Sequence, residues 1–309
     1  MIISVSRRTD IPAFYFEWFL NRLQEGFVLV RNPMNQRMVS HIELSPETVD
    51  AFVFWSKNPR PLLDGIEEIA PYPFYLHFTL TAYEADLEAG LPQRPERLDT
   101  FKRLADIIGP ERLIWRYDPI VINKKYPADF HLNAFGQLAE NLEHYTERCI
   151  ISFVEVYAKI KKNLATLGVG DLSEQQKISL ARSLRETAES FGHRISACCG
   201  NFDIQSAGLS PASCIDKNLL ETIIGRELNL NKDKGQRPNC ACVQSIDIGT
   251  YDTCRHNCLY CYAKRSSKQA ALFNYSVNSP MLCDAPQHGD NIVNRPVKSS
   301  KIFRPLFPL

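Results

Sequence analysis

The sequence has 309 residues, enough for one large domain or two ordinary ones, and 44% of them are apolar, which is too many for a disordered chain. Its 36 basic and 35 acidic residues leave a net charge of +1, so the total charge indicates neither a nucleic acid nor an anionic membrane as the main partner. We find no apolar run of about 18 residues and no signal-peptide pattern, and we expect a cytoplasmic protein without a membrane span.

Short β-like runs alternate with helical patterns over the first two hundred residues. Strands are predicted at residues 2–5, 51–55, 74–80, 113–116, 149–156 and 194–198. Helices are predicted between them at residues 12–25, 59–70, 95–108, 129–145 and 173–191, where apolar residues recur at helical spacing. Repeated strand–helix units are typical of parallel strands covered by helices. We therefore predict an α/β fold, a full or partial (β/α) barrel, with a doubly wound open sheet as the alternative.

The chain divides into two parts at about residue 205. Residues 1–205 hold the six strand–helix units. Residues 206–309 hold a short predicted helix at 217–224, a seventh strand at 243–248, a cysteine cluster and a tail that is predicted as mostly loop after Lys264. We expect this second part to pack on the same domain.

Three closely spaced cysteines near the C-terminus carry the clearest chemical signal. Cys254, Cys258 and Cys261 have the spacing C-x3-C-x2-C in a polar segment that contains Arg255 and His256. Three such thiolates can each hold one iron of a single [4Fe–4S] cluster, which leaves the fourth iron without a cysteine from the motif. Zinc is the alternative, but it prefers four ligands that often come as C-x2-C pairs. The spacing therefore favours an iron–sulfur site.

The other cysteines permit more than one interpretation. Cys240 and Cys242 are possible additional metal ligands, although an extended segment would point them to opposite faces. Their polar neighbours indicate that they are not deeply buried, and we predict an auxiliary metal role for at least one of them. Three further cysteines are either core thiols or part of a second metal site, namely Cys198, Cys199 and Cys214. Two more, Cys149 and Cys283, are expected in the core.

Polar residues at the carboxyl ends of the predicted strands are candidates for a binding site, because parallel barrels place their active sites there. Arg7, Lys57 and Arg116 could bind a carboxylate or phosphate. Asp118 and Glu155 could hold an amine or ribose hydroxyls, or act as acid–base groups. The alternative is that these charges only pair with one another or, at Asp118, form a turn. A core position is expected for His77, and His256 is expected to be a simple loop residue.

The cysteine motif, with Tyr260 before its third cysteine, resembles the cluster motif of the radical S-adenosylmethionine superfamily. The resemblance implies a [4Fe–4S] cluster, S-adenosyl-L-methionine, an electron donor such as a flavodoxin or ferredoxin, and an enzyme that generates a 5′-deoxyadenosyl radical on an unidentified substrate. In that superfamily the motif follows the first barrel strand. Here six strand–helix units precede it, an order that suits a permuted barrel in which strand 243–248 lies beside strand 2–5. The superfamily's Gly-Gly-Glu, the usual partner of the methionyl amine, is missing.

Most of the chain also resembles an uncharacterised bacterial family, the domain of unknown function 1848 family. The resembling segments are residues 6–12, 31–33, 54–59, 115–119 and 247–263. This resemblance supplies no substrate. Two further functions stay open. One is a non-radical [4Fe–4S] protein for electron transfer or sensing, with Cys214, Cys240 or Cys242 as the fourth ligand. The other is a zinc-stabilised binding module.

Overall fold

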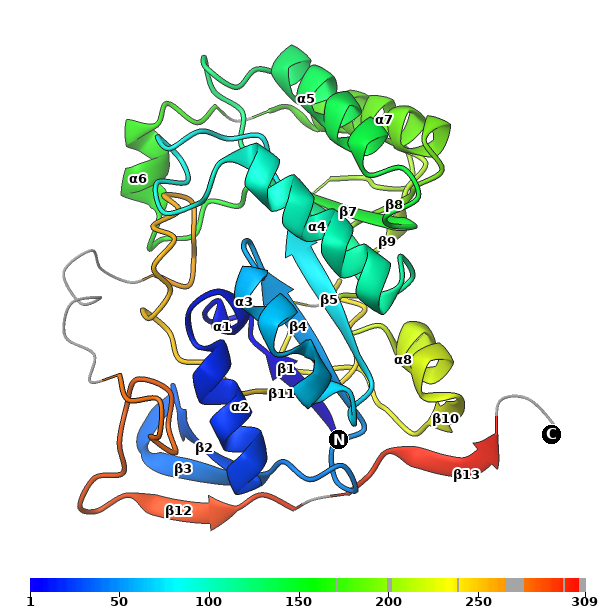
Figure 1. The fold of residues 1–309 in the computed structure, drawn as a ribbon. Coiled ribbons are helices and arrows are strands. Elements are labelled where there is room, and N and C mark those ends of the chain that lie inside the picture. The colour runs from blue at the N-terminus through cyan, green and yellow to red at the C-terminus, as the bar shows by residue number, and fades with distance from the viewer. Residues whose placement is uncertain (171, 199–201, 238, 265–274, 297, 306–309) are drawn as a thin grey trace.

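The computed structural model describes residues 1–170, 172–198, 202–237, 239–264, 275–296 and 298–305. Its centre is a parallel sheet of eight strands (Figure 1). In spatial order these are β11 (Ile246–Asp247), β1 (Ile2–Val5), β4 (Ala51–Ser56), β5 (Phe74–Thr79), β6 (Leu113–Ile120), β7 (Arg148–Phe153), β8 (Arg194–Ala197) and β9 (Ser210–Pro211). Chain order is kept from β1 to β9, whereas the order of a doubly wound sheet reverses at a switch point.

The seventh predicted strand lies in this sheet, as expected. β11 runs parallel to β1, with Ile3 opposite Ile246 and Ser4 opposite Asp247. It is shorter than the predicted 243–248. Among the described residues the edge strands β9 and β11 do not pair with each other. The α/β class and the parallel sheet are therefore confirmed, and the sheet does not close into a barrel over this part of the chain.

Helices cover one face of the sheet, and Figure 1 shows α4 crossing it between α2 and α3 on one side and α5 and α7 on the other. They are α1 (Ile11–Phe14), α2 (Phe16–Glu25), α3 (Arg60–Asp64), α4 (Arg94–Ile108), α5 (Ala128–Asn141) and α7 (Glu174–Ser190). Phe19 of α2 meets Phe52 and Phe54 of β4 edge to face, and Phe101 of α4 packs on Phe78 of β5. None of the helices in the described part of the chain is long and apolar enough to cross a membrane.

Two of the predicted helices are each divided. Residues 12–25 form α1 and α2 because the backbone leaves helical geometry at Tyr15, with φ −139° and ψ 23°. Residues 59–70 form α3 and the 3-10 turn η1 (Ile66–Ile69), with the break at Gly65. A Cβ at Gly65 would lie only 2.9 Å from a side-chain carbon of α2. Close packing between helices therefore decides where this helix ends.

The opposite face of the sheet, which we call its inner face, is covered by the described residues of the segment 212–243. α8 (Lys217–Ile224), which has the predicted bounds, lies in this segment. Alternate residues of the strands pack against it, namely Ile2, Ala51, Val53, Tyr75, Ile114 and Ile150. Both faces of the sheet are thus shielded from water, as parallel sheets require.

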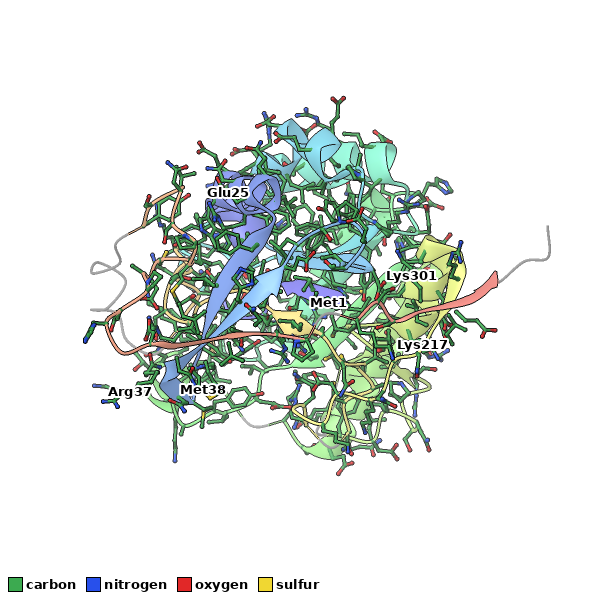
Figure 2. All side chains as sticks on the ribbon, turned by 90° about the horizontal axis from the view of Figure 1, so that it is seen from below. Met1, Glu25, Arg37, Met38, Lys217 and Lys301 are labelled. Carbon is green, nitrogen blue, oxygen red and sulfur yellow. The ribbon has the colours of Figure 1, made fainter. Side chains whose placement is uncertain are left out.

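Two small sheets surround the main one. β2 (Phe27–Asn32) and β3 (Asn35–Glu43) form an antiparallel hairpin that the sequence analysis did not predict, and β12 (Asn291–Asn294) joins β3 in parallel. β10 (Arg226–Leu228) pairs with β13 (Lys301–Pro305). The tail is therefore not only loop, although residues 265–274 lie outside the described part. Figure 2 shows this side from below, with Met38 of β3 near one edge and Lys301 of β13 beside α8.

Candidate metal centre and adjoining cavity

The loop that carries the three cysteines leaves the sheet at the carboxyl end of β11. Asp247 accepts hydrogen bonds there from the hydroxyls of Ser4 (2.7 Å) and Ser6 (2.6 Å). It also accepts from the backbone N–H groups of Arg7 (2.8 Å) and Gly249 (3.0 Å). Gly249 passes so close to β1 that a Cβ would overlap the Ser6 side chain. Hydrogen bonds to a charged acceptor are strong, so these contacts fix the direction in which the loop begins.

Contacts from the first two helices and from the loop after β5 hold the cysteine loop in place. The hydroxyl of Tyr15 donates to the carbonyl of Thr253 (2.6 Å), and the N–H of Gly90 donates to the carbonyl of His256 (2.8 Å). A Cβ at Gly90 would lie 2.8 Å from the Cα of His256, so only glycine fits. The buried His256 ring places Nε2 at 2.8 Å from Oδ2 of Asp10. His256 is therefore an anchor of the loop rather than the simple loop residue that we expected.

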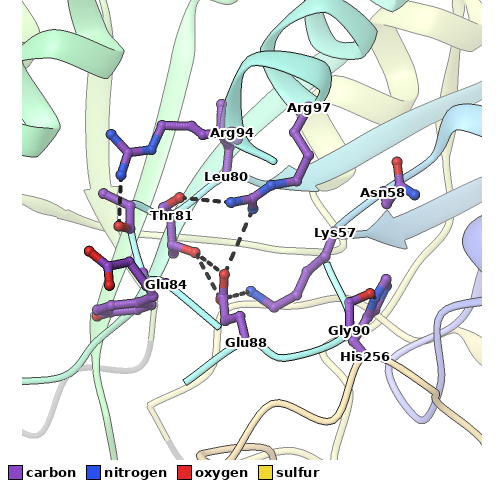
Figure 3. Close-up of polar contacts among 12 residues, drawn as sticks. Lys57, Asn58, Leu80, Thr81, Glu84, Glu88, Gly90, Arg94, Arg97 and His256 are labelled. Atoms are coloured by element: carbon purple, nitrogen blue, oxygen red, sulfur yellow. Dashed lines mark hydrogen bonds and ion pairs between the residues drawn. The ribbon is translucent and has the colours of Figure 1, made fainter. Parts of the chain in front are cut away.

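Glu88 links the cysteine loop to the sheet, and Figure 3 shows its contacts with Lys57, Thr81 and Arg97. Its buried carboxylate accepts from Nζ of Lys57 (2.8 Å), from Oγ1 of Thr81 (2.8 Å) and from the hydroxyl of Tyr260. Nη1 of Arg97 lies 3.8 Å away. Burial alone would raise the pKa of Glu88, but Lys57 and Arg97 outweigh burial and lower it. The sequence analysis missed this residue because it stands in a polar loop with no periodic pattern.

The three cysteines of this loop differ in burial. Cys258 is buried and forms a β-bridge with Glu88, and Cys254 and Cys261 are half-buried. Cys258 also packs with Leu164 of α6 (Lys161–Thr166). Burial raises the pKa of all three thiols, that of Cys258 to about 12. Metal ligation would require them as thiolates, and a bound cation would supply the compensating charge.

The kind of metal group that the cysteine loop could hold follows from the chemistry of its three sulfur donors. Over the described residues, no group of three or more His, Cys, Asp or Glu side chains is placed so that it could hold a metal ion as it stands. Three sulfur donors from one short loop are the ligands that iron–sulfur clusters use, and soft thiolates also suit zinc. The residues present therefore fit a [4Fe–4S] cluster by their chemistry and spacing.

A cavity of about 310 Å³ adjoins the loop at the carboxyl ends of the strands. Cys261 lines it, and so do all five strand-end residues that the sequence analysis selected, namely Arg7, Lys57, Arg116, Asp118 and Glu155. A larger hollow of about 720 Å³ lies near the amino ends of β7 and β8, and none of those selected residues lines it. The structure thus gathers residues from distant parts of the sequence around one cavity beside the cysteine loop.

The buried Arg116 and the half-buried Asp118 form an ion pair on one wall of the cavity. Nε and Nη2 of Arg116 donate to Oδ2 of Asp118 at 3.0 Å and 2.5 Å, and the hydroxyl of Ser152 contacts Oδ1. Burial alone would lower the pKa of Arg116, but the Asp118 carboxylate outweighs it and raises the pKa. The guanidinium therefore stays charged while its remaining Nη1 donates to Sγ of Cys214 at 3.0 Å.

The other three strand-end residues are also held by partners. Arg7 lies over the ring of Trp55, with 5.8 Å between the guanidinium carbon and the ring centroid. Lys57 pairs with Glu88, as described above. Glu155 follows β7 instead of lying within it, and it pairs with Arg237. The predicted strand 149–156 was too long, so the apolar run did not bury this carboxylate.

Cys240 and Cys242 differ from our expectation in two ways. Both are buried, at 5% and 2% exposure, because the segment 212–243 is enclosed against the inner face of the sheet. Their thiols also contact each other rather than pointing to opposite faces, since the segment is not an extended strand. Cys242 contacts Cys214 as well, and Cys214 contacts Cys198. Cys149 and Cys283 are buried as predicted, and Cys199 lies outside the described residues.

Comparison with known proteins identifies a family. No curated protein matches the chain. One family model matches residues 2–263, a range that includes the whole eight-stranded sheet and all three cysteines of the loop. The family is described as a domain of unknown function, which agrees with the resemblance noted from the sequence. The chain therefore belongs to the family described as Domain of unknown function (DUF1848).

Proposed function

We propose that this protein is a [4Fe–4S] protein of the radical S-adenosylmethionine type, with Cys254, Cys258 and Cys261 as the cluster ligands. One observation carries the proposal. The cysteine loop follows a strand that pairs in parallel with β1, and its Cys261 lines a cavity at the carboxyl ends of the sheet. A metal group in the loop would therefore adjoin a space large enough for a small molecule.

The chain's own residues would hold and shield this group. Tyr15, Gly90 and Asp10 fix the loop backbone and its histidine, and Glu88 with Lys57 fixes the turn around Cys258. When bound together, the cluster and S-adenosylmethionine would supply one-electron radical chemistry. The buried aromatic and apolar side chains around the loop would exclude water from that chemistry.

The cavity offers charges of both signs to a cofactor or substrate. Arg7 and Lys57 supply cations, and Asp118 and Glu155 supply carboxylates. Opposite charges on the walls of one cavity suit a zwitterionic amino-acid head group such as that of S-adenosylmethionine. This arrangement supports a role in binding, and it would take the place of the missing Gly-Gly-Glu.

The fold and setting that we propose agree with this chemistry. The sheet resembles a permuted, open form of the radical-enzyme barrel, because β11 takes the first position beside β1. A flavodoxin or ferredoxin is the proposed electron donor. The cytoplasm is the proposed compartment, since it keeps thiols reduced and free to bind metal.

Anaerobic reconstitution followed by electron paramagnetic resonance tests the proposal. The reduced wild type should give a [4Fe–4S] signal that changes when S-adenosylmethionine is added. Substituting any one of Cys254, Cys258 and Cys261 by Ala should remove the signal and the iron, whereas the buried control Cys149→Ala should keep both. A signal that ignores S-adenosylmethionine would favour a closed cluster for electron transfer or sensing. Zinc in place of iron would favour the binding module.

A further inference from the structure

Four other cysteines meet on the inner face of the sheet, from three separate parts of the chain. Cys198 follows β8, Cys214 precedes α8, and Cys240 and Cys242 precede β11. The sulfurs of Cys198 and Cys214 are 3.6 Å apart. The thiols of Cys214 and Cys242 contact each other, and so do those of Cys242 and Cys240. All four residues line the cavity of about 310 Å³.

The sulfur–sulfur distance indicates the kind of metal group that these thiols would fit. With Zn–S bonds of about 2.3 Å, two sulfurs on one tetrahedral ion lie about 3.8 Å apart. In a cubane each thiolate binds a different iron, which separates the sulfurs much further. The 3.6 Å between Cys198 and Cys214 therefore matches a single tetrahedral ion. The contacts form a chain from Cys198 through Cys214 and Cys242 to Cys240, so binding one shared ion requires side-chain rotations that bring all four sulfurs together.

Donors around the sulfurs provide an independent second observation. Nη1 of the buried Arg116 donates to Sγ of Cys214 (3.0 Å), and the N–H of Ile215 donates to Sγ of Cys242 (3.4 Å). The carbonyl of Cys214 accepts from the Tyr75 hydroxyl and from Nε2 of His77, both at 2.8 Å. Thiolate ligands carry negative charge, and a guanidinium and backbone N–H groups directed at sulfur stabilise it. These contacts also orient the Cys214 backbone.

We propose that Cys198, Cys214, Cys240 and Cys242 bind one tetrahedral divalent metal ion, with zinc as the fitting metal. Binding forms four metal–sulfur bonds, and each thiol releases its proton to solvent. The ion joins the end of β8, the start of α8 and the approach to β11, so it holds the segment 212–243 on the sheet. This site has different ligands from the proposed cluster, although Cys261 lines the same cavity, and it does not depend on the proposed radical chemistry.

Metal counting and cobalt substitution test the site in the full chain. Wild type should hold one zinc per chain, and Co²⁺ in its place should give the intense visible bands of tetrahedral thiolate coordination. A Cys198→Ser, Cys214→Ser double variant should lose the zinc and the bands but keep the iron. The Cys254→Ala, Cys258→Ala, Cys261→Ala triple variant should lose the iron but keep the zinc. The control Cys149→Ala should keep both metals.

Several results would overturn the proposal. If the wild type takes up no zinc and binds no tetrahedral Co²⁺, the proposal is wrong. This result is decisive even if the double variant fails to fold. Cobalt bands that persist in the double variant, or that vanish only in the triple variant, would place the ion elsewhere. Iron at twice the content of one cluster, halved in the double variant, would replace the single ion by a second cluster.

Discussion

Glu88 is the buried carboxylate that compensates the positive charges beside the cysteine loop. Its carboxylate is 3% exposed and contacts Lys57, Thr81, Tyr260 and, at a longer distance, Arg97. Removing one partner of a buried ion pair leaves the other charge without compensation in a medium that solvates it poorly. Neighbouring Glu84 makes a similar ion pair with Lys125, but that pair is exposed to water.

Glu88→Gln should therefore lower the free energy of unfolding by about 3 kcal/mol, because Lys57 and Arg97 keep their charges after the carboxylate is gone. Glu84→Gln, the matched control from the same loop, should change it by less than about 0.5 kcal/mol, as expected for an exposed pair. Urea unfolding at pH 7 measures both. Equal effects of the two substitutions would contradict the buried network.

His131 makes stability depend on pH. Its ring is fully buried, donates Nε2–H to the carbonyl of Val121 (3.1 Å) and accepts at Nδ1 from the Tyr117 hydroxyl (2.8 Å). Burial lowers its pKa from 6.5 to about 4. The unfolded chain therefore binds the proton more tightly, and stability present above pH 6.5 is lost as the pH falls toward 4.

Comparison of wild type with His131→Gln should reveal this proton. The variant should be less stable at pH 7, and the difference should shrink by up to roughly 3 kcal/mol between pH 6.5 and pH 4. His144→Gln is the control, because the side chain of His144 is 87% exposed. The difference in the free energy of unfolding between His144→Gln and wild type should stay constant over the same pH range. Urea unfolding measures both differences. A constant difference for His131→Gln as well would refute the assignment.

At the scale of the elements, the junction of β1 and β11 sets the position of the cysteine loop. Gly249→Ala should destabilise the protein by roughly 1–3 kcal/mol, since its new methyl group overlaps Ser6. Ser6→Gly in the same chain should recover part of that loss by removing the obstacle. The four members of this double-mutant cycle can be compared by thermal unfolding.

Gly170→Ala is the control for that cycle, because nothing lies within 4 Å of a Cβ there. It should be neutral or slightly stabilising. If Ser6→Gly adds to the damage of Gly249→Ala instead of relieving it, the close approach is not the cause.

The elements that the sequence predicts correctly are those with an apolar pattern in their own residues. The strands at 51–55 and 74–80 and the helix at 217–224 each show a clear apolar pattern, and all three form. The hairpin of β2 and β3 was missed because its outer residues are polar, and its partner β12 lies far along the chain. Helix breaks at Tyr15 and Gly65 depend on tertiary packing, which single-sequence patterns do not contain.

The features of the candidate site likewise fall into those that the sequence could predict and those that it could not. The gathering of the strand-end charges around one cavity could be predicted, because strand ends are local features, whereas the role of the cysteine triplet as metal ligands stays a prediction. Glu88 and the contact of His256 with Asp10 could not be predicted, since both depend on loops that meet only in the folded chain. The contact between Cys198 and Cys214 likewise requires knowing that the segment 212–243 covers the inner face.

At the scale of the whole molecule, Asp50 joins the start of β4 to the tail. Its buried carboxylate accepts from the Ser299 hydroxyl (2.6 Å) and from the N–H of Ser300 (2.7 Å), and Nζ of Lys301 lies 3.9 Å away. Asp50→Asn removes the charge and should release this part of the tail. Trypsin should then cut near Lys298 and Lys301 about tenfold faster for each 1.4 kcal/mol lost.

Mass spectrometry of the early fragments measures that cleavage. Asp203→Asn is the control, since among the contacts described the Asp203 carboxylate accepts hydrogen bonds only from Gln205 and Ser206 of its own exposed loop. It should leave the rate at Lys298 and Lys301 unchanged. An unchanged rate in Asp50→Asn would mean that β13 holds the tail without this carboxylate.

The pairing of β1 with β11 also has a consequence for biosynthesis. The hydroxyl of Ser4 bonds to a carboxylate 243 residues further along the chain. At about 5–20 residues per second, a ribosome needs roughly 12 to 50 s to make the intervening chain. During that time one edge of β1 has no partner, and unpaired edges are sites of wrong association. The cysteine loop is translated after this interval, so the proposed cluster could be loaded only once nearly the whole sheet has been made.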